Sequence, residues 1–477
     1  MKTPARNLTL MTDLYQLTMI DAYIKSGKEN QLAVFDFFFR NKEEFNYALF
    51  AGLEQAVTYI KNLKFFDDDI GYLKSLNLFS EKTLDYLKNF CFDGDIYSVP
   101  EGTVVFPGEP ILVVKAKIAQ AQLVETALLN ILNHQTLIAT KASRIVGAAR
   151  GKAMEFGLRR AQGPDAGIYG ARAAYIGGCF STSNVLAGKL FGIPVSGTHA
   201  HSYIMSFPDE LTAFRAYAKA NPNSCLLLVD TYDTLRSGVK NAITVFKELK
   251  EQGYKPVGIR LDSGDLAYLS KVARKMLDEA GFPDAIICAS GDLDEYSIQS
   301  LMSQGARIDL WGVGTRLITS EKTPSLGGIY KLVAVEEDGR LAPKIKISDN
   351  MVKITNPGFK TIYRLYDKGD MAIADLICLH DEEIDTTKPL TIFHPIETWK
   401  KMTLTDFKAK KLHLKIFDKG NLVYTSPAIQ QIAEYAKEDL ATFWSEYKRI
   451  DNPHIYKVDL SDKLYNLKQK LLKANGG

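Results

Sequence analysis

Arg260 and Asp262 stand two positions apart in the segment GIRLDSGDL (258–266), directly after a short apolar run. In an extended strand, residues two apart point to the same face, so we expect both side chains on one side. A guanidinium can bind a phosphate or a carboxylate through two parallel hydrogen bonds, and a carboxylate can bind Mg²⁺ or ribose hydroxyls. The pair therefore indicates a site for an anionic sugar derivative, with a structural ion pair at a strand end as the alternative.

Two later segments, ASGDLDE (289–295) and WGVGTRL (311–317), place glycines where an apolar run passes into a helical pattern. Glycine lets the backbone approach a phosphate closely, and the free N–H groups at the start of the next helix can bind the anion. Gly312, Gly314 and Thr315 are the candidates for this role. A simple tight turn is the alternative for each loop alone, but two such loops in succession favour a phosphate site.

Two histidines, His199 and His201, lie among small residues in SGTHAHSYIMSF (196–207). Small neighbours leave space around an imidazole, which suits a nucleophile or an acid–base group. A structural role is the usual alternative for such a histidine, and a metal pair is less favoured because no third ligand lies close in the sequence. In EFGLRR (155–160), Arg159 and Arg160 could bind a carboxylate or a diphosphate, and a solvated helix end is the alternative.

Four short apolar runs would position these residues. Each run ends in a polar or glycine-containing turn before a helical segment, and their starts are 32, 29 and 22 residues apart: Cys225–Val229, Val257–Leu261, Ile286–Ala289 and Ile308–Trp311. This is the spacing of β–α units in a parallel sheet or barrel. The loops after such strands form the active site, so we expect these loops to meet.

The flanking regions have different patterns. In the N-terminal part, the patterns predict a strand at residues 31–40, a helix at 51–63, short strands at 94–114 and a long helix at 122–149. After about residue 340 the chain is lysine-rich and strand-like. Here we expect a solvated strand face near 400–417 and a helix after Pro427. We therefore expect an N-terminal α+β domain (1–135), an α/β barrel with the catalytic loops (136–355) and a C-terminal α+β region (356–477).

Composition narrows the class of protein. The 477 residues carry 59 Lys and Arg against 56 Asp and Glu, a net charge of +3, which does not favour nucleic acid as a partner. The five widely spaced cysteines include no C-x-x-C pair, so neither a zinc site nor a disulfide framework is expected. Without a long apolar run, we expect no membrane span, no signal peptide and a cytoplasmic location.

Several of these segments together resemble the nicotinate phosphoribosyltransferase family. The matching segments, in family order, are TDLYQLTM (12–19), EFGLRR (155–160), STSN (181–184), SGTHAHS (196–202), RLDSGD (260–265), GVGT (312–315) and PGFKTIYRL (357–365). The resemblance implies an α+β domain packed on an irregular (β/α) barrel of the type II phosphoribosyltransferase kind. It also implies a homodimer with active sites near the subunit interface.

The implied reaction joins nicotinate to phosphoribosyl pyrophosphate, giving nicotinate mononucleotide and pyrophosphate for NAD biosynthesis. ATP hydrolysis would be coupled to it through a phosphohistidine, which the match places at His201, with His199 as a neighbour. Mg²⁺ is the implied cofactor, and Asp262 a candidate ligand for it.

The other roles implied by the resemblance follow by position. Tyr15 would stack on the pyridine ring, across the dimer, with Thr198 beside the site and Arg159 near the ring or its carboxylate. Arg260 would contact nicotinate or the phosphoribosyl group, and Asp262 the ribose or Mg²⁺. The 5-phosphate would bind to Gly312, Gly314 and Thr315, near Ser290, Gly291 and Asp292 of SGD (290–292), where some members have asparagine.

Ser183 bears on the choice of substrate. Nicotinamide-specific relatives carry at this position an aspartate that binds the amide, and its charge would repel the carboxylate of nicotinate. The neutral serine therefore favours the acid over the amide.

Three other functions stay open at this point. The nearest is a phosphoribosyltransferase for nicotinamide or quinolinate. A sugar-phosphate lyase or aldolase of the barrel type would need a Schiff-base lysine at a strand end, and none of the four runs contains lysine. A metabolite-binding protein without catalysis is the third.

Overall fold

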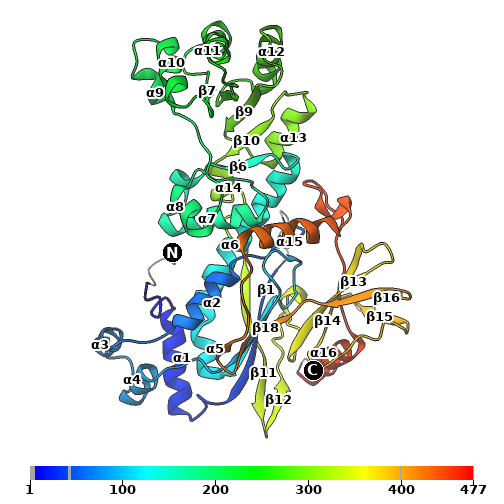
Figure 1. Cartoon of the computed structure of the whole chain (residues 1–477). Helices are drawn as coiled ribbons and strands as arrows, with labels where there is room; N and C mark the ends of the chain where they lie inside the picture. Colours follow the sequence, from blue (N-terminus) through cyan, green and yellow to red (C-terminus); the bar gives the residue numbers. More distant parts are fainter. Residues whose placement is uncertain (1–5, 41–44, 398, 476–477) are drawn as a thin grey trace. The chain divides into compact units, whose positions relative to one another are not determined.

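The computed structural model describes residues 6–40, 45–397 and 399–475, which form two compact units (Figure 1). Unit 1 consists of Met1–Leu137 and Ser325–Gly477, and unit 2 consists of Ile138–Pro324. The boundary falls within the long helix α6 (Glu125–Ala148). The division into three domains by sequence segment stays a prediction. Within the described residues, no helix has both the length and the apolar character needed to cross a lipid bilayer.

Unit 2 is built on a fully parallel sheet of five strands. In spatial order the strands are β6 (Ala153–Glu155), β10 (Leu310–Val313), β9 (Ile286–Gly291), β8 (Gly258–Leu261) and β7 (Leu226–Leu228). Four of them correspond to the apolar runs of the sequence. Side chains on these strands, including Leu227, Ile259, Ile287 and Trp311, are almost fully buried. Continuous apolar runs are typical of parallel strands that are covered on both faces.

Helices follow each of these strands, and the longer ones bury an apolar stripe. Helix α11, for example, buries Val239, Ala242, Val245, Phe246 and Leu249, which recur at helical spacing. The helices of unit 2 are α7 (Pro164–Ile176), α8 (Val185–Phe191), α9 (His201–Met205), α10 (Glu210–Ala220), α11 (Val239–Glu251), α12 (Leu266–Glu279), α13 (Glu295–Ser303) and α14 (Thr315–Ile318), with short turns η1 (Leu158–Arg160) and η2 (Thr234–Gly238).

The segment 180–199 links the two edges of this sheet. Beyond β6, single parallel bridges join Glu155 to Thr182 and Thr182 to Val195. At the other edge, the Thr198 hydroxyl donates to the carbonyl of Leu226 (2.6 Å), and the Leu228 N–H donates to Nε2 of His199 (3.2 Å). The strands thus form a closed ring in which side chains replace part of the backbone ladder. The expectation of an irregular (β/α) barrel is confirmed.

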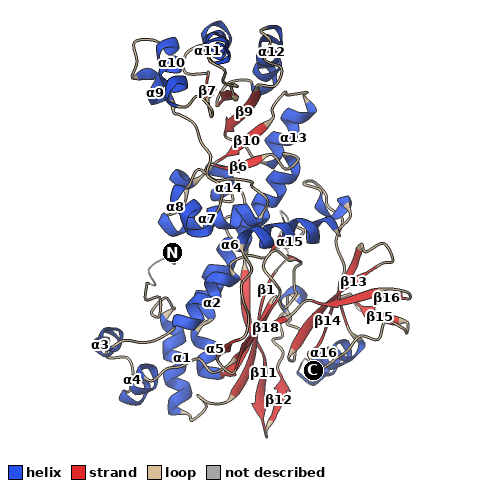
Figure 2. Ribbon diagram, viewed as in Figure 1, coloured by secondary structure: helices blue, strands red, loops and turns tan. Residues whose placement is uncertain are grey.

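Unit 1 contains a seven-stranded antiparallel sheet, drawn with its helices in Figure 2. Its order is β12 (Arg340–Pro343), β11 (Gly328–Glu337), β1 (Leu32–Phe39), β5 (Leu112–Lys117), β3 (Asp95–Ser98), β18 (Leu414–Asp418) and β19 (Asn421–Leu422). The chain thus pairs N-terminal with C-terminal strands. The helices from the N-terminal part are α1 (Leu14–Lys25), α2 (Leu53–Asn62), α3 (Asp67–Ser75), α4 (Glu81–Lys88) and α5 (Ile118–Leu123).

The C-terminal part of unit 1 forms a second sheet, of six strands. Its order is β16 (Lys401–Leu404), β15 (Leu390–Phe393), β20 (Val458–Leu460), β14 (Ala372–Leu379), β13 (Lys360–Tyr366) and β17 (Lys408–Lys411). Helix α16 (Asp462–Asn475) packs on β14 and β15 (Figure 1). The remaining elements are helix α15 (Ile429–Ala441), the short pair β2 (Ala48–Leu49) and β4 (Val104–Val105), and the turns η3 (Met351–Lys353) and η4 (Ser445–Lys448). The α+β character expected for both terminal regions is present.

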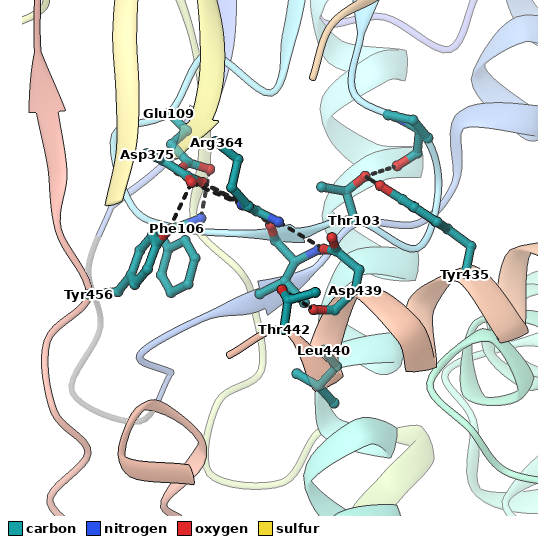
Figure 3. Close-up of polar contacts among 12 residues, drawn as sticks. Thr103, Phe106, Glu109, Arg364, Asp375, Tyr435, Asp439, Leu440, Thr442 and Tyr456 are labelled. Carbon is teal, nitrogen blue, oxygen red and sulfur yellow. Dashed lines mark hydrogen bonds and ion pairs between the residues drawn. The ribbon is translucent and has the colours of Figure 1, made fainter. Parts of the chain in front are cut away.

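One buried arginine connects these parts of unit 1. The guanidinium of Arg364, on β13, lies between the carboxylates of Asp375 (2.7 Å) and Asp439 (2.9 Å) and donates to the carbonyl of Val104 (2.6 Å) (Figure 3). All three charged side chains are inaccessible to solvent, or nearly so. Strands β13 and β14, helix α15 and strand β4 therefore share a single charge centre.

A third carboxyl, that of Glu109, lies against this centre. Its burial, and next the neighbouring charge of Asp375, raise the pKa of Glu109 well above its usual value of 4.5. Arg364 supplies one positive charge for the two carboxylates of Asp375 and Asp439, so a third buried anion would add to an excess of negative charge. The surroundings of Glu109 therefore favour its protonated form. The hydroxyl of Tyr456 donates to Asp375 (3.0 Å) from another side.

We predict that Arg364→Leu lowers the free energy of unfolding by roughly 3–5 kcal/mol, because two buried carboxylates lose their cation. Urea denaturation of the full chain measures this loss. The matched control is Lys368→Ala, which removes the exposed ion pair with Asp406 and should cost less than about 1 kcal/mol. Equal effects of the two substitutions would contradict the role given to Arg364.

The same cluster predicts a pH dependence. Because the folded-state pKa of Glu109 is raised, its contribution to stability is full below about pH 4.5 and falls as the pH rises towards the folded value. Glu109→Gln should remove this decline, so that its free energy of unfolding changes less with pH than that of the wild type. If the free energies of unfolding of the two proteins changed with pH in parallel, the raised pKa of Glu109 would be contradicted.

Candidate active site

The carboxyl ends of five parallel strands meet at one edge of the unit 2 sheet. Because neighbouring strands are in parallel register, the residues that follow them become neighbours. Gly312 pairs with Ser290 across β10 and β9, and Arg260 pairs with Cys288 across β8 and β9. Residues predicted from separate segments of the sequence thus lie side by side.

Arg260, Asp262 and Ser290 form one hydrogen-bonded group. The Arg260 guanidinium donates to Ser290 Oγ (2.7 Å) and to Asp262 Oδ1 (2.9 Å), and the Ser290 hydroxyl also donates to Asp262 Oδ1. Partial burial acts to raise the pKa of Asp262, but the hydrogen bonds from Ser290 and the charge of Arg260 outweigh it and lower the pKa. Asp262 is therefore an anion that fixes the direction of the guanidinium.

Asp230, which the sequence analysis did not select, holds the next loop. Its Oδ2 accepts hydrogen bonds from the N–H of Asp262 (2.8 Å), the N–H of Ser263 (2.7 Å) and the hydroxyl of Ser263 (2.9 Å). Its side chain is only 2% exposed. Asp230 follows β7 as Asp262 follows β8, and this equivalent position was the signal available in the sequence.

His201 begins helix α9 at the same edge, with its side chain 39% exposed. Its Nδ1 lies 3.1 Å from the hydroxyl of Thr231. Its Nε2 lies 3.8 Å from Asp262 Oδ2 and 4.0 Å from Asp230 Oδ1. An accessible imidazole nitrogen therefore lies next to the carboxylate that binds Arg260.

His199 has a different environment. It is buried, and its Nε2 accepts the hydrogen bond from Leu228 that helps to close the barrel. Burial lowers the pKa of His199 to about 4, so the ring stays neutral at physiological pH. The structure thus gives the two histidines separate positions, one in the wall and one at the open edge.

The glycines of the two predicted phosphate loops occupy close contacts. Gly291 has φ +115°, and a Cβ atom there would lie 2.6 Å from the carbonyl oxygen of Asp262. A Cβ on Gly312 would lie 2.6 Å from the ring of Phe156. The structure also corrects the predicted boundaries, since Ser290, Gly291 and Gly312 belong to the ends of strands β9 and β10 rather than to loops.

Phe156, a second residue that the sequence analysis missed, forms an apolar surface at this edge. Its ring lies against Gly312, and the guanidinium of Arg260 is 5.8 Å from the ring centre. The preceding Glu155 is buried and accepts hydrogen bonds from Gly157 N–H and the Thr182 hydroxyl. Ser183, which follows Thr182, donates its N–H to the Glu155 carbonyl (2.9 Å). The EFG and STSN segments are therefore fixed to each other.

The remaining predicted residues are less involved in these contacts. Thr198 takes part in closing the barrel. Arg159, in turn η1, and Asp292 are exposed, and neither makes an ion pair with another described residue. Tyr15 belongs to unit 1, where its hydroxyl donates to Glu125 (3.3 Å). Within the described chain, no group of three or more His, Cys, Asp or Glu residues forms a metal site.

Comparison with family models covers nearly the whole chain. Residues 10–133 match the nicotinate phosphoribosyltransferase (NAPRTase) N-terminal domain, 151–370 match the NAPRTase family, and 359–468 match its C-terminal domain. The chain belongs to the nicotinate phosphoribosyltransferase family. The resemblance seen in the sequence and the enzyme class predicted from it, a phosphoribosyltransferase of NAD biosynthesis, are confirmed.

Individual relatives agree with the family models. The chain is 52% identical over 467 residues to the nicotinate phosphoribosyltransferase of Bacillus subtilis, covering 97% of this chain and 95% of that protein. The crystal structure of human nicotinic acid phosphoribosyltransferase shares the fold with a TM-score of 0.85 at 31% identity, covering 96% of this chain and 99% of that one. The alternatives of a barrel lyase and of a non-catalytic binding protein are therefore set aside.

A more distant structure shares the fold alone. The nicotinate-nucleotide pyrophosphorylase from Pyrococcus furiosus superposes with a TM-score of 0.71 at 21% identity, over 93% of this chain and 98% of that one.

We predict that the charge of Asp230 matters beyond its hydrogen bonds. Asp230→Asn keeps an oxygen for the loop amides but removes the anion near His201, and we expect it to lower kcat about tenfold or more. Ser263→Ala, the control, removes one of three hydrogen bonds to Asp230 and should change kcat less than about threefold. Steady-state assays measure kcat of both variants. An unchanged kcat in Asp230→Asn would limit Asp230 to a structural role.

Proposed function

We propose that the protein transfers a phosphoribosyl group from phosphoribosyl pyrophosphate to nicotinate, and that it couples this reaction to ATP hydrolysis through a phosphohistidine at His201. The supporting observation is the accessible Nε2 of His201 beside the Arg260–Asp262–Ser290 group. Nicotinate is the nucleophile whose ring nitrogen replaces pyrophosphate at the anomeric carbon. Arg260 supplies positive charge near the negative charge that develops on the leaving group.

The phosphate of the sugar would bind at the ends of β9 and β10. Among the described residues, the backbone N–H groups of Gly314, Thr315 and Arg316 have no acceptor, as expected at the start of a helix. These three amides can donate to a phosphate oxygen. Ser290, Gly291 and Gly312 complete the surface, where the two glycines allow close packing against the Asp262 carbonyl and the Phe156 ring.

The hydroxyl of Thr231 would select the reactive form of His201. A neutral imidazole has one protonated and one unprotonated nitrogen. When Nδ1–H donates to Thr231 Oγ1, the lone pair is on Nε2, the nitrogen that faces Asp230 and Asp262. This tautomer can attack the γ-phosphorus of ATP, forming an N–P bond as ADP leaves. Attack by water on the phosphohistidine then returns the free imidazole and phosphate.

Mg²⁺ fits the carboxylates around His201. Asp230 Oδ1 is buried without a hydrogen-bond partner among the described residues, and Asp262 Oδ2 faces the same imidazole nitrogen. Mg²⁺ is commonly bound by one or two carboxylates together with water and substrate phosphates. When bound, it would neutralise charge on the phosphates. Asp230 and Asp262 are the residues that would hold it.

Nicotinate would bind beside Phe156 and Ser183. The ring of Phe156 offers an apolar surface, and Arg260 above it offers a cation for a carboxylate. Ser183 carries no charge that would repel the carboxylate of nicotinate, whereas an aspartate would. Tyr15 from a second copy and Arg159 would complete this pocket, in the roles that the family resemblance implies.

A homodimer is supported by exposed apolar side chains on unit 2. Leu158, Phe180, Val185, Leu186 and Val195 are all at least 40% exposed. Val195 packs against Gly188 of helix α8, which also carries Val185 and Leu186. Val185, Leu186 and Val195 therefore form a group of exposed apolar residues at helix α8, and such groups are typical of protein interfaces. The cytoplasmic location stays a prediction, and the five cysteines are all free thiols.

The phosphohistidine can be tested directly. We predict that wild-type protein incubated with γ-³²P-ATP acquires acid-labile phosphate and that His201→Asn acquires none, because the amide cannot form the N–P bond. The variant should retain slow, ATP-independent transfer. Label incorporation by the variant at the wild-type level would exclude His201 as the phosphorylated residue.

Thr231 provides a matched pair of variants for the same assay. Thr231→Val keeps the shape but removes the hydroxyl, and we expect about tenfold slower labelling because the tautomer is no longer fixed. Thr231→Ser keeps the hydroxyl and should label at close to the wild-type rate. Equal rates for Val and Ser would contradict the role of the hydroxyl.

The proposed dimer can be tested by sedimentation velocity. Val185→Glu places a charge in the exposed apolar group, so we expect the dimer peak to shift to the monomer position in sedimentation velocity and transfer activity to fall. Tyr254→Glu, another exposed position of unit 2, is the control and should leave the dimer intact. A dimeric Val185→Glu protein with full activity would place the interface elsewhere.

A further inference from the structure

An ion pair connects the two loops that the proposed function assigns to phosphate. Arg316 follows Thr315 in helix α14, and its Nη1 donates to Asp294 Oδ2 at 3.0 Å. Asp294 comes two residues after the SGD segment (290–292) and is the N-cap of helix α13. The end of β9 and the end of β10 are thus joined by a side-chain contact in addition to the strand pairing.

The two carboxylate oxygens of Asp294 accept hydrogen bonds from different partners. Oδ1 accepts the N–H of Ser297 (2.8 Å) and so caps α13, while Oδ2 accepts Arg316. The residue is 3% exposed. Burial acts to raise the pKa of Asp294, but the hydrogen bonds from Ser297 and the charge of Arg316 lower it, so the carboxylate is ionised. A charge this well buried restricts where its arginine partner can lie.

Other cations hold the start of α13 in place. Lys141 and Arg144, both on α6, form buried ion pairs with Glu295 at 2.7 and 3.2 Å. The ammonium of Lys322 lies 4.1 Å from the ring centre of Tyr296. The start of α13 is therefore fixed from the side of α6. Arg316 is the member of this group that comes from the second phosphate loop itself.

We propose that Arg316 is a positioning residue for phosphoribosyl pyrophosphate, which it serves by holding the two phosphate loops at a fixed separation through Asp294. The inference rests on the proposed function, since it assumes that these loops bind the phosphate. The guanidinium is already occupied by Asp294 and by Glu321 (3.1 Å). Its effect on the substrate is therefore indirect, through the backbone amides that precede it.

A double-mutant cycle tests this arrangement with the full-length enzyme. Arg316→Gln and Asp294→Asn each break the ion pair, and asparagine still caps α13. We expect each variant to raise KM for phosphoribosyl pyrophosphate about tenfold and to leave KM for nicotinate within about twofold. The double variant should be no worse than either single one, because the interaction is lost only once. Glu321→Gln, which removes only the exposed partner of Arg316, should resemble the wild type.

Three results would overturn the proposal. If Asp294→Asn leaves KM for phosphoribosyl pyrophosphate unchanged while Arg316→Gln raises it, Arg316 contacts the phosphate directly. If both variants lower the melting temperature without a selective change in KM, the ion pair is only structural. Additive losses in the double variant would show that the two residues act separately. Arg316→Met, which keeps the aliphatic stem and removes the charge, replaces Arg316→Gln should the latter fail to fold.

A separate variant tests the assumption that this loop binds the phosphate, independently of the role given to Arg316. Gly314→Ala adds a methyl group at the proposed phosphate loop, where a Cβ would lie 3.2 Å from the Phe156 carbonyl oxygen. An unchanged KM for phosphoribosyl pyrophosphate in Gly314→Ala would mean that this loop does not bind the phosphate. A raised KM in Gly314→Ala with no effect in the Arg316 cycle would reject the positioning role alone.

Discussion

The arrangement of the site depends on the buried carboxylate of Asp230. One of its oxygens accepts three hydrogen bonds from Asp262 and Ser263, so the loop after β8 is held by the residue after β7. Asp262 in turn directs Arg260, and Ser290 on β9 binds both. Three successive strand ends are therefore coupled by side chains. Because each loop is fixed by its neighbour, the positions of charges at this edge do not depend on any one loop being rigid by itself.

Much of this arrangement could be predicted from the sequence, because it follows from short-range patterns. Apolar runs indicated four of the five strands of the unit 2 sheet, and the polar residues after them indicated the edge where chemistry would occur. The assignment of His201 rather than His199 came from the resemblance. The structure adds a physical reason, since Nε2 of His199 is used in the barrel wall while that of His201 is accessible.

Other features could not be predicted, because they depend on contacts between distant residues. Nothing near Arg364 in the sequence indicates that it binds the carbonyl of Val104 and the carboxylate of Asp439. The closing of the barrel by the Thr198 side chain has no periodic pattern either. Asp230 is a different case, because its position after β7 matched that of Asp262 after β8. Comparing equivalent positions across the β–α units would have identified it.

Charge balance explains why carboxylates can occur in a site for anionic substrates. Around His201, Asp230 and Asp262 carry two negative charges and Arg260 carries one positive charge, so the group is negative before any substrate arrives. A diphosphate approaching alone would be repelled by this group, while one accompanied by a divalent cation would not. Under the proposed function, the same two carboxylates would thus favour substrates that arrive as magnesium complexes and disfavour other anions. The same pair of side chains would then both bind the cation and select substrates by their charge.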